Sequence, residues 1–293
     1  IVTGADGLPL MTDQDVDPRW VGSGWTVFNN KGKPVRQFEP FFSDTHKLDA
    51  DARIGVSPWL FHDPVGRVVA TLHPNHTWEK VVFDPWQQTT WDVNDTVLKS
   101  VRAGDPEPDP DAVGFFGRLP EADYRPTWHE LRTVGEHAAA FAARYPNQKD
   151  RENETDAATK AEAHAGTPTT VHFDALGRPF LTLADNGPDP AQPDKHLLFA
   201  TRVELDIEGN QREVRDAIEQ AGDPLGRIVM RYACDMLGNR IHQLSMEAGA
   251  RWMLNDVAGQ PLRAWDSRGH EFHTEYDALR RPVAQTVRGT TAD

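Results

Sequence analysis

A four-residue phrase, Asp or Asn followed three positions later by Gly, recurs along this chain and constrains its fold more than any other feature. Asp or Asn at the first position of a type I turn accepts hydrogen bonds from the backbone two residues on, and Gly at the fourth position can adopt the positive φ that starts a return strand. Each phrase therefore predicts the tip of a β-hairpin. The predicted structural turn residues are Asn29, Gly32, Asp63, Gly66, Asp174, Gly177, Asp206, Gly209, Asp235, Gly238, Asp256, Gly259 and Asp277.

The intervals between these tips indicate a repeat. Asp63 and Asp84 are 21 residues apart, Asp235 and Asp256 are again 21 apart, and Asp266 follows ten residues later. Apolar and polar residues alternate in the intervening segments, as expected for β-strands. A period of about 20 residues built from hairpins is typical of repeat arrays. The predicted fold class is therefore mainly β, a curved antiparallel array of β-hairpins with a helical insertion.

Composition and charge exclude several classes of protein. The 293-residue chain carries a net charge of −14, which argues against nucleic acid or an anionic membrane as a partner, because both bind basic surfaces. The single Cys234 cannot form an internal disulfide, which fits synthesis in a reducing compartment. No apolar run approaches the length of a membrane span, and no signal peptide is visible, so we expect no direct membrane insertion. The chain starts with Ile1, and we expect both ends to lie within a longer polypeptide.

Changes in the residue pattern divide the chain into three parts. Strand-like segments fill residues 1–103, and they resume in residues 167–293. The segment between them, 104–166, opens with a Pro-rich stretch at 105–110 that reads as a linker, because Pro lacks an amide donor and suits neither helix interiors nor central strands. We expect this segment to be an insertion at the periphery of the strands. A second Pro-rich stretch, 187–193, predicts a loop that interrupts the later strands.

Two helices are expected within the insertion. Thr127 begins the first, with Glu130 at the capping-box spacing, and apolar residues at helical intervals extend it to about Arg144. The second helix covers the Ala-rich stretch 152–165.

Four tryptophans lie close together in the first strand block and have two interpretations. They could form a stacking platform for sugar rings, which would make the chain a carbohydrate-binding module of a cell surface. Aromatic side chains also fill the cores of sheets and pair across strands, and this interpretation is favoured. The platform would consist of Trp59, Trp78, Trp86 and Trp91, with Asp84 and Asp92 as hydrogen-bond acceptors.

Other patterns for catalysis or metal binding are weak. His62, His73 and His76 lack the spacing of known zinc sites, and 73–76 reads as a turn in which Asn75 adopts the left-handed conformation. Paired carboxylates would suit glycoside hydrolysis only if they faced each other across a cleft, and solvated charge is the favoured interpretation. We therefore predict no catalytic, cofactor-binding or metal-binding residues. The carboxylates considered are Asp109 with Asp111, and Asp13, Asp15 and Asp17.

Several phrases resemble a known repeat family. The stretches 173–178, 235–241 and 276–281 resemble the YD-repeat, or Rhs repeat, whose core is Tyr-Asp-x-x-Gly-Arg. The longer stretches 25–32, 73–81 and 250–256 resemble the middle of the B component of insecticidal toxin complexes and related Salmonella-virulence-plasmid-B-like proteins. The similarity extends over nearly the whole chain.

This resemblance implies a structural role. In that family, the YD-repeat strands wind into a hollow shell that holds a toxic C-terminal segment until delivery. The chain would then be a wall segment without catalysis of its own, secreted as part of a larger toxin assembly after synthesis in the bacterial cytoplasm. Its partners would be flanking repeats of the same longer chain, other toxin-complex components and the encapsulated toxin segment. The family's self-cleaving core has no counterpart, because 63–66 matches its Asp-Pro-x-Gly stretch only in letters.

Overall fold

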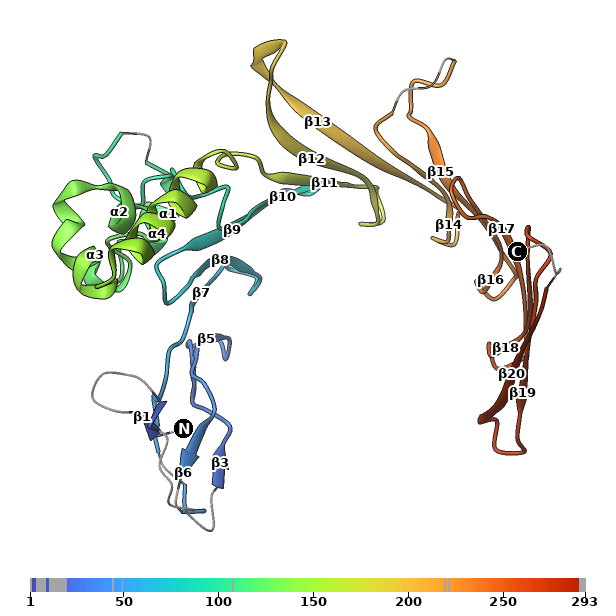
Figure 1. Ribbon diagram of the computed structural model, residues 1–293, viewed down its shortest axis with the longest axis horizontal. Coiled ribbons are helices and arrows are strands. Elements are labelled where there is room, and N and C mark those ends of the chain that lie inside the picture. The colour runs from blue at the N-terminus through green and yellow to red at the C-terminus, as the bar shows by residue number, and fades with distance from the viewer. Residues whose placement is uncertain are drawn as a thin grey trace. The chain divides into compact units, whose positions relative to one another are not determined.

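The protein consists of two compact units built mainly from antiparallel strands (Figure 1). The computed structural model describes the backbone of residues 2–3 and 9–10 and the residues 20–43, 45–48, 50–106, 108–218, 220 and 222–289. The first unit contains Ile1–Val82 and Thr89–Pro168, and the second contains Phe83–Gln88 and Thr169–Asp293.

Sixteen strands form one hydrogen-bonded sheet in which almost every strand lies beside its neighbours in sequence. Its order is β20-β19-β18-β17-β16-β15-β14-β13-β12-β11-β10-β9-β8-β7-β5-β4, and two further pairs are β1-β2 and β3-β6. The predicted fold class, a mainly β antiparallel array of hairpins, is confirmed. The strands are β1 (Val2–Thr3), β2 (Pro9–Leu10), β3 (Trp20–Gly22), β4 (Thr26–Phe28), β5 (Pro34–Gln37), β6 (Phe41–Ser43), β7 (Trp59–His62), β8 (Val68–Leu72), β9 (Trp78–Phe83), β10 (Gln87–Trp91), β11 (Thr169–Phe173), β12 (Pro179–Asp189), β13 (Gln192–Leu205), β14 (Gln211–Arg215), β15 (Ile228–Cys234), β16 (Arg240–Ser245), β17 (Gly249–Asn255), β18 (Pro261–Asp266), β19 (Glu271–Tyr276) and β20 (Pro282–Arg288).

The helices all lie between residues 110 and 162 of the described chain, in the first unit. All four α-helices of the described chain carry apolar or cationic side chains that become buried, so they are not a detached appendage. The helices are α1 (Pro110–Phe116), α2 (Trp128–Thr133), α3 (Ala138–Arg144) and α4 (Gln148–Glu162), with 3-10 turns η1 (Glu121–Asp123) and η2 (Gly135–His137).

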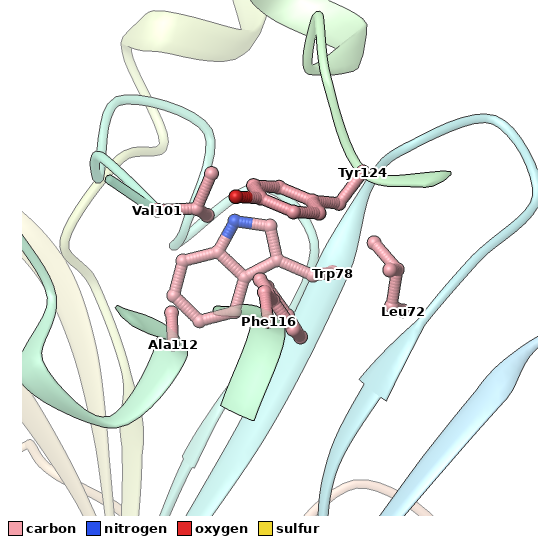
Figure 2. Packing of buried hydrophobic residues seen from close by; sticks show 6 residues of the cluster. All are labelled: Leu72, Trp78, Val101, Ala112, Phe116 and Tyr124. Carbon is pink, nitrogen blue, oxygen red and sulfur yellow. The ribbon is translucent and has the colours of Figure 1, made fainter. Parts of the chain in front are cut away.

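The core of the first unit joins strands β8 and β9 to helix α1 (Figure 2). Phe116 of α1 is fully buried, and its ring meets the Trp78 ring edge-on, with the centroids 5.6 Å apart. Such apolar contacts remove large aromatic surfaces from water and stabilise the unit. The expectation that the whole insertion is peripheral is therefore wrong for α1. The cluster consists of Leu72, Trp78, Val101, Ala112, Phe116 and Tyr124.

The start of α1 departs from the sequence-based prediction of a helix-free linker at 105–110. Asp109 caps the helix by accepting hydrogen bonds from the amides of Asp111 and Ala112 at 3.1 and 3.0 Å. Pro110 occupies the first helical position, where its missing amide hydrogen has no helical partner to lose. Proline therefore starts this helix.

The predicted helix from Thr127 to about Arg144 is present as two shorter ones. Thr127 and Glu130 form the predicted capping box at the start of α2. Val134 then adopts an extended conformation, with φ −93° and ψ 120°, and separates α2 from η2 and α3. Helix α4 begins earlier than the predicted residue 152, because the Asn147 side chain accepts a hydrogen bond from the Lys149 amide at 2.9 Å and caps the helix.

The second unit contains the long hairpin β12–β13, which runs through most of the predicted loop at 187–193. Only Pro190 and Ala191 separate the two strands. The pairing register shifts between Asp185 and Pro188, and this bulge accommodates the proline, which has no amide to donate.

The second unit is a sheet in which the described residues form no buried apolar core. Every buried apolar side chain among the described residues belongs to the first unit, as the core cluster above and five further side chains illustrate. In the second unit, side chains such as Met253, Ala264 and Phe272 share one face of the sheet at intermediate exposure. A single sheet of this kind leaves apolar surface on both faces in contact with water.

Candidate functional site: the five-residue hairpin turns

The repeated phrase forms a five-residue turn closed by two backbone hydrogen bonds. In the turn that begins at Asp174, the Asp174 amide donates to the Arg178 carbonyl and the Gly177 amide donates to the Asp174 carbonyl, both at 2.9 Å. Gly177 has φ +73°, a left-handed conformation that costs glycine no steric strain. The same two bonds close the turns that begin at Asn29, Asp63, Asp206, Asp235, Asp256, Asp266 and Asp277.

The carboxylate at the first position of the turn accepts three hydrogen bonds from its own turn. The Oδ1 atom of Asp174 accepts from the amides of Leu176 and Arg178, both at 2.9 Å. Its Oδ2 atom accepts from the Nε of Arg178 at 2.7 Å. The carboxylate therefore fixes both the backbone of the turn and the side chain that follows the glycine.

Different side chains at the fifth position bind the carboxylate in the same way. The amide Nδ2 of Asn210 donates to Asp206 Oδ2 at 3.0 Å, and the Nε of Arg281 donates to Asp277 Oδ2 at 2.7 Å. Sequence reasoning assigned no role to this fifth position. The repeat core Tyr-Asp-x-x-Gly-Arg ends in an Arg at this fifth position, and that Arg could have indicated a partner for the turn carboxylate. Further pairs of this kind are Arg67 with Asp63, Asn239 with Asp235 and His270 with Asp266.

These hydrogen bonds stabilise the charged form of the turn carboxylates. The backbone amide and side chain of Arg178 lower the pKa of Asp174, and the Asn210 side chain and amide lower the pKa of Asp206. In both cases partial burial opposes the shift without reversing it. The pKa values of four further turn carboxylates are also lowered: those of Asp63, Asp235, Asp266 and Asp277.

Neighbouring turns along one edge of the second unit contact each other. Arg178 Nη1 donates to the carbonyl of Asp206 in the next turn at 3.2 Å. Further along, Gln260 Nε2 donates to the Arg280 carbonyl at 3.4 Å, and the Arg280 guanidinium pairs with Asp256. The fifth position thus links consecutive hairpins in addition to closing its own turn.

Two of the described turns that directly join paired strands place a residue other than glycine in the left-handed conformation. Arg280 has φ +62° in the last turn, where the sequence pattern lacks its glycine. In the turn from His73 to Thr77, His76 has φ +64°, so the expectation that Asn75 takes this conformation is wrong. Asn75 instead accepts a hydrogen bond from the Thr77 amide at 3.1 Å.

The four tryptophans of the possible sugar platform have different environments. Trp78 is 3% exposed and belongs to the core, so its ring is not available for stacking on a ligand. Trp59 lies under the guanidinium of Arg36, and Trp91 faces the Lys80 ammonium at 5.4 Å. Trp86, in the turn between β9 and β10, is 60% exposed.

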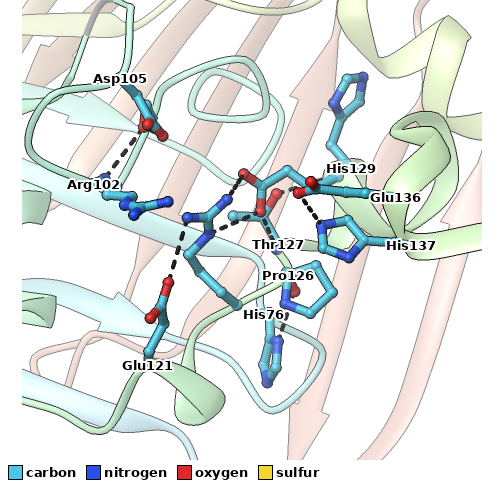
Figure 3. A network of polar contacts seen from close by, with 12 residues as sticks. His76, Arg102, Asp105, Glu121, Pro126, Thr127, His129, Glu136 and His137 are labelled. Carbon is cyan, nitrogen blue, oxygen red and sulfur yellow. Dashed lines mark hydrogen bonds and ion pairs between the residues drawn. The ribbon is translucent and has the colours of Figure 1, made fainter. Parts of the chain in front are cut away.

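Two of the three histidines considered for a metal site contact other groups, and the Nδ1 atom of the third, His62 in β7, is buried without a hydrogen-bond partner. His76 Nδ1 lies 2.8 Å from the Pro126 carbonyl, next to the polar network of Glu121 and Thr127 (Figure 3). His73 Nε2 lies 3.9 Å from a carboxylate oxygen of Glu79. No group of three or more His, Cys, Asp or Glu side chains has the arrangement of a metal site in the described part of the chain.

One of the carboxylate pairs considered for hydrolysis forms a buried ion cluster. Lys80 of β9 donates to Asp109 at 2.7 Å and to Asp111 at 2.9 Å. Lys80 and Asp109 are 7% and 6% exposed, so the expectation of solvated charge is wrong for Asp109. Burial lowers the pKa of Lys80, but the hydrogen bonds that its ammonium donates to both carboxylates outweigh this effect, and the pKa is raised. Asp13, Asp15 and Asp17 lie outside the described residues.

The ion cluster joins α1 to the sheet. Asp109 both caps the helix and binds the strand lysine, so the start of α1 is held against β9.

Cys234, at the end of β15, is a half-buried free thiol.

Comparisons with known proteins show which fold this is. No protein-family model matches the chain, and no curated protein matches it. The chain resembles two solved structures of TcdB2-TccC3. With the form without the hypervariable C-terminal region it shares 18% sequence identity over 93% of its length, with a TM-score of 0.60. With another structure of TcdB2-TccC3 it shares 19% sequence identity over 94% of its length, also with a TM-score of 0.60. It also resembles a Photorhabdus luminescens Tc holotoxin pore, with 18% identity over 94% of the chain and a TM-score of 0.59. The chain spans only about a tenth of the length of these chains, 10% and 11%. At this identity the comparison shows a shared fold.

None of the described helices is long and apolar enough to cross a lipid bilayer.

Proposed function

We propose that the chain is a structural wall segment of an encapsulating YD-repeat shell in an insecticidal-type toxin complex, without catalysis of its own. The observation that carries this proposal is the second unit, a sheet of hairpins with no buried apolar side chain among its described residues. Such a sheet suits a wall. Because its described residues form no core of their own, neighbouring segments would have to cover its apolar faces and stabilise it. The likeness in fold to TcdB2-TccC3 over 93% of the chain supports the same role.

The partners follow from this role. Flanking repeats of a longer polypeptide would pair with β20, the outermost strand of the sheet in the described part of the chain, because an edge strand presents backbone groups that can pair. Other toxin-complex components and an encapsulated toxin segment would contact the wall. The net charge of −14 makes nucleic acid an unsuitable partner. We further propose that the assembly is made in the bacterial cytoplasm and then secreted.

The wall function is tested in the complete protein that carries this segment. Two hairpins, β15–β18, would be deleted from residue 228 to residue 266, which preserves the alternation of the remaining strands. If the segment is wall, the deletion makes the enclosed segment accessible to added protease. The control variant Glu208→Gln, at an exposed turn position, leaves the enclosed segment protected. Full protection after the deletion, in an assembly that still forms, contradicts the proposal.

Carbohydrate binding is the alternative function, and a glycan array of the isolated chain distinguishes it. The wall function predicts no selective glycan binding. Selective binding that is lost in the variant Trp86→Ala would favour the alternative, because Trp86 is the most exposed of the four tryptophans.

A further inference from the structure

Six consecutive hairpin turns along one edge of the second unit present large apolar side chains to solvent. The turns join β9 to β10, β11 to β12, β13 to β14, β15 to β16, β17 to β18 and β19 to β20, and every second connection of the sheet lies on this edge. The exposed fractions of these side chains range from 60% to 97%. We call this set the tip row, and it consists of Trp86, Leu176, Ile207, Met236, Leu237, Val257 and Leu279.

Turn geometry does not require these apolar residues. In five of these turns the hydrogen bonds come from the first, third, fourth and fifth residues, through backbone amides and the first carboxylate. The shorter β9–β10 turn is closed by the Asp84 amide, which donates to the Gln87 carbonyl, and by the Asp84 carboxylate, which accepts from the amides of Trp86 and Gln87. The middle side chains point away from these bonds, and turns ordinarily carry polar residues there. Glu208 is the single charged residue among the twelve middle residues of these six turns, in a chain with a net charge of −14.

The opposite edge of the same sheet differs. Its short turns carry Pro190-Ala191, Met246-Glu247-Ala248 and Ser267-Arg268. The large aliphatic side chains in its longer connection and in these turns are at most 55% exposed: Ile218, Leu225 and Met246. The sheet therefore has one apolar turn edge and one more polar turn edge.

We propose that the tip row is an interface that binds a second hairpin edge of the same kind, and that in the isolated chain this partner is a second copy. The inference rests on the proposed wall function, in which this array of hairpins is one segment of a larger shell. Successive turns of the tip row are two strands apart, a spacing of about 9–10 Å. The turn edge of another array of hairpins has the same spacing, so its turns can match those of the tip row one by one.

The size of the tip row fits such a pairing. Burial of one large apolar side chain removes roughly 60–120 Å² from water, so seven of them bury about 400–800 Å² on each partner. Stable protein interfaces bury about 800 Å² per partner, and weaker ones bury less. Two tip rows facing each other therefore reach the range of a specific, concentration-dependent association.

A lipid surface suits the tip row less well. Each tip has an Asp carboxylate at its base, and in Asp206 and Asp235 the turn hydrogen bonds lower the pKa and favour the charged form. Insertion into an apolar phase would desolvate these charges, which is unfavourable. Contact between two rows of tips leaves the carboxylates at the bases of the turns in water.

Sedimentation velocity of the full chain over a range of concentrations tests the inference. The wild-type chain should associate reversibly into dimers. The tip variant should weaken dimerisation at least tenfold, with an unchanged circular dichroism spectrum. It carries four substitutions: Ile207→Ser, Met236→Ser, Val257→Ser and Leu279→Ser. Serine is well tolerated in turns, so the hairpins should persist. The control variant carries three similar changes on a face of the sheet: Leu198→Ser, Leu244→Ser and Leu254→Ser.

Three outcomes overturn the inference. The wild-type chain could remain monomeric at all concentrations, the control variant could weaken association as much as the tip variant, or the tip variant could associate as strongly as the wild type. Binding to neutral phosphatidylcholine vesicles that the tip variant loses, without self-association of the wild type, would assign the row to a lipid surface instead. A monomeric chain would leave the wall function intact, because the protease experiment tests that function separately.

Discussion

At the scale of single residues, the turn carboxylate and the glycine carry the hairpin. The carboxylate of Asp174 accepts three hydrogen bonds within five residues, and Gly177 supplies the left-handed conformation that the turn needs. The sequence predicts both residues because their chemistry is local. It does not predict the contact of Arg178 with the next turn, which depends on strand pairing.

Substitution of the turn glycine should destabilise the protein. Gly177→Val forces a β-branched residue into φ +73°, although no atom lies within 4 Å of the added Cβ. We expect a loss of about 1–3 kcal/mol in the free energy of unfolding from conformational strain alone. The control is Gly114→Ala in α1, where φ is helical and space is also open, and which should gain about 0.5–1 kcal/mol. Urea titrations of both variants check this, and an unchanged midpoint for Gly177→Val would contradict the turn geometry.

Acid should weaken the fold through the same carboxylates. The folded state lowers the pKa of Asp206 below its ordinary value of 3.8, so its contribution is complete above pH 3.8 and is lost as the pH falls through the folded pKa. The wild-type unfolding midpoint should therefore decrease as the pH falls from about 4 to 3. In Asp206→Asn this decrease should be smaller, because an Asn amide has no proton to gain and Asn29 shows that Asn can accept the same two amide bonds. Equal pH profiles for both proteins would be inconsistent with this linkage.

At the scale of elements, the hairpins were predictable and the helix positions less so. The turn phrases mark strand ends locally, whereas α1 depends on Phe116 finding Trp78 across the fold. The capping box at Thr127 predicts the start of α2 correctly. The break at Val134 has no comparable signal, because apolar residues at helical intervals continue past it.

The buried cluster of Lys80 with Asp109 should be essential for the attachment of α1. Lys80→Met leaves the Asp109 carboxylate buried beside an apolar side chain, and we expect a loss of about 3–5 kcal/mol. The double variant Lys80→Met with Asp109→Asn should recover part of this loss, because the Asn side chain still caps α1 without a charge. Thermal unfolding of the three proteins checks the order. A double variant less stable than Lys80→Met alone would show that the two residues act independently.

At the scale of the whole molecule, the two units should differ in local stability. The first has a core of aromatic and aliphatic side chains, whereas the second has none among its described residues. Local opening is easier where few apolar contacts hold a segment. Amide hydrogen exchange read by mass spectrometry should therefore be slowest in peptides of β8, β9 and α1, and faster in β15–β20. Slower exchange in β17–β19 than in β8–β9 would contradict this difference.

The strand order has a consequence for how the chain reaches its fold. Except for β5 and β7, which have β6 between them in the chain, neighbours in the large sheet are consecutive strands, and the helices separate only one such pair, β10 and β11. Contacts of such low sequence separation form quickly, because little loop-closure entropy opposes them. Each hairpin closed by its own carboxylate can join the growing sheet as it leaves the ribosome, in order of synthesis. The number of hairpins can then change in evolution by whole units, since a duplicated hairpin needs only its two neighbours to find its place.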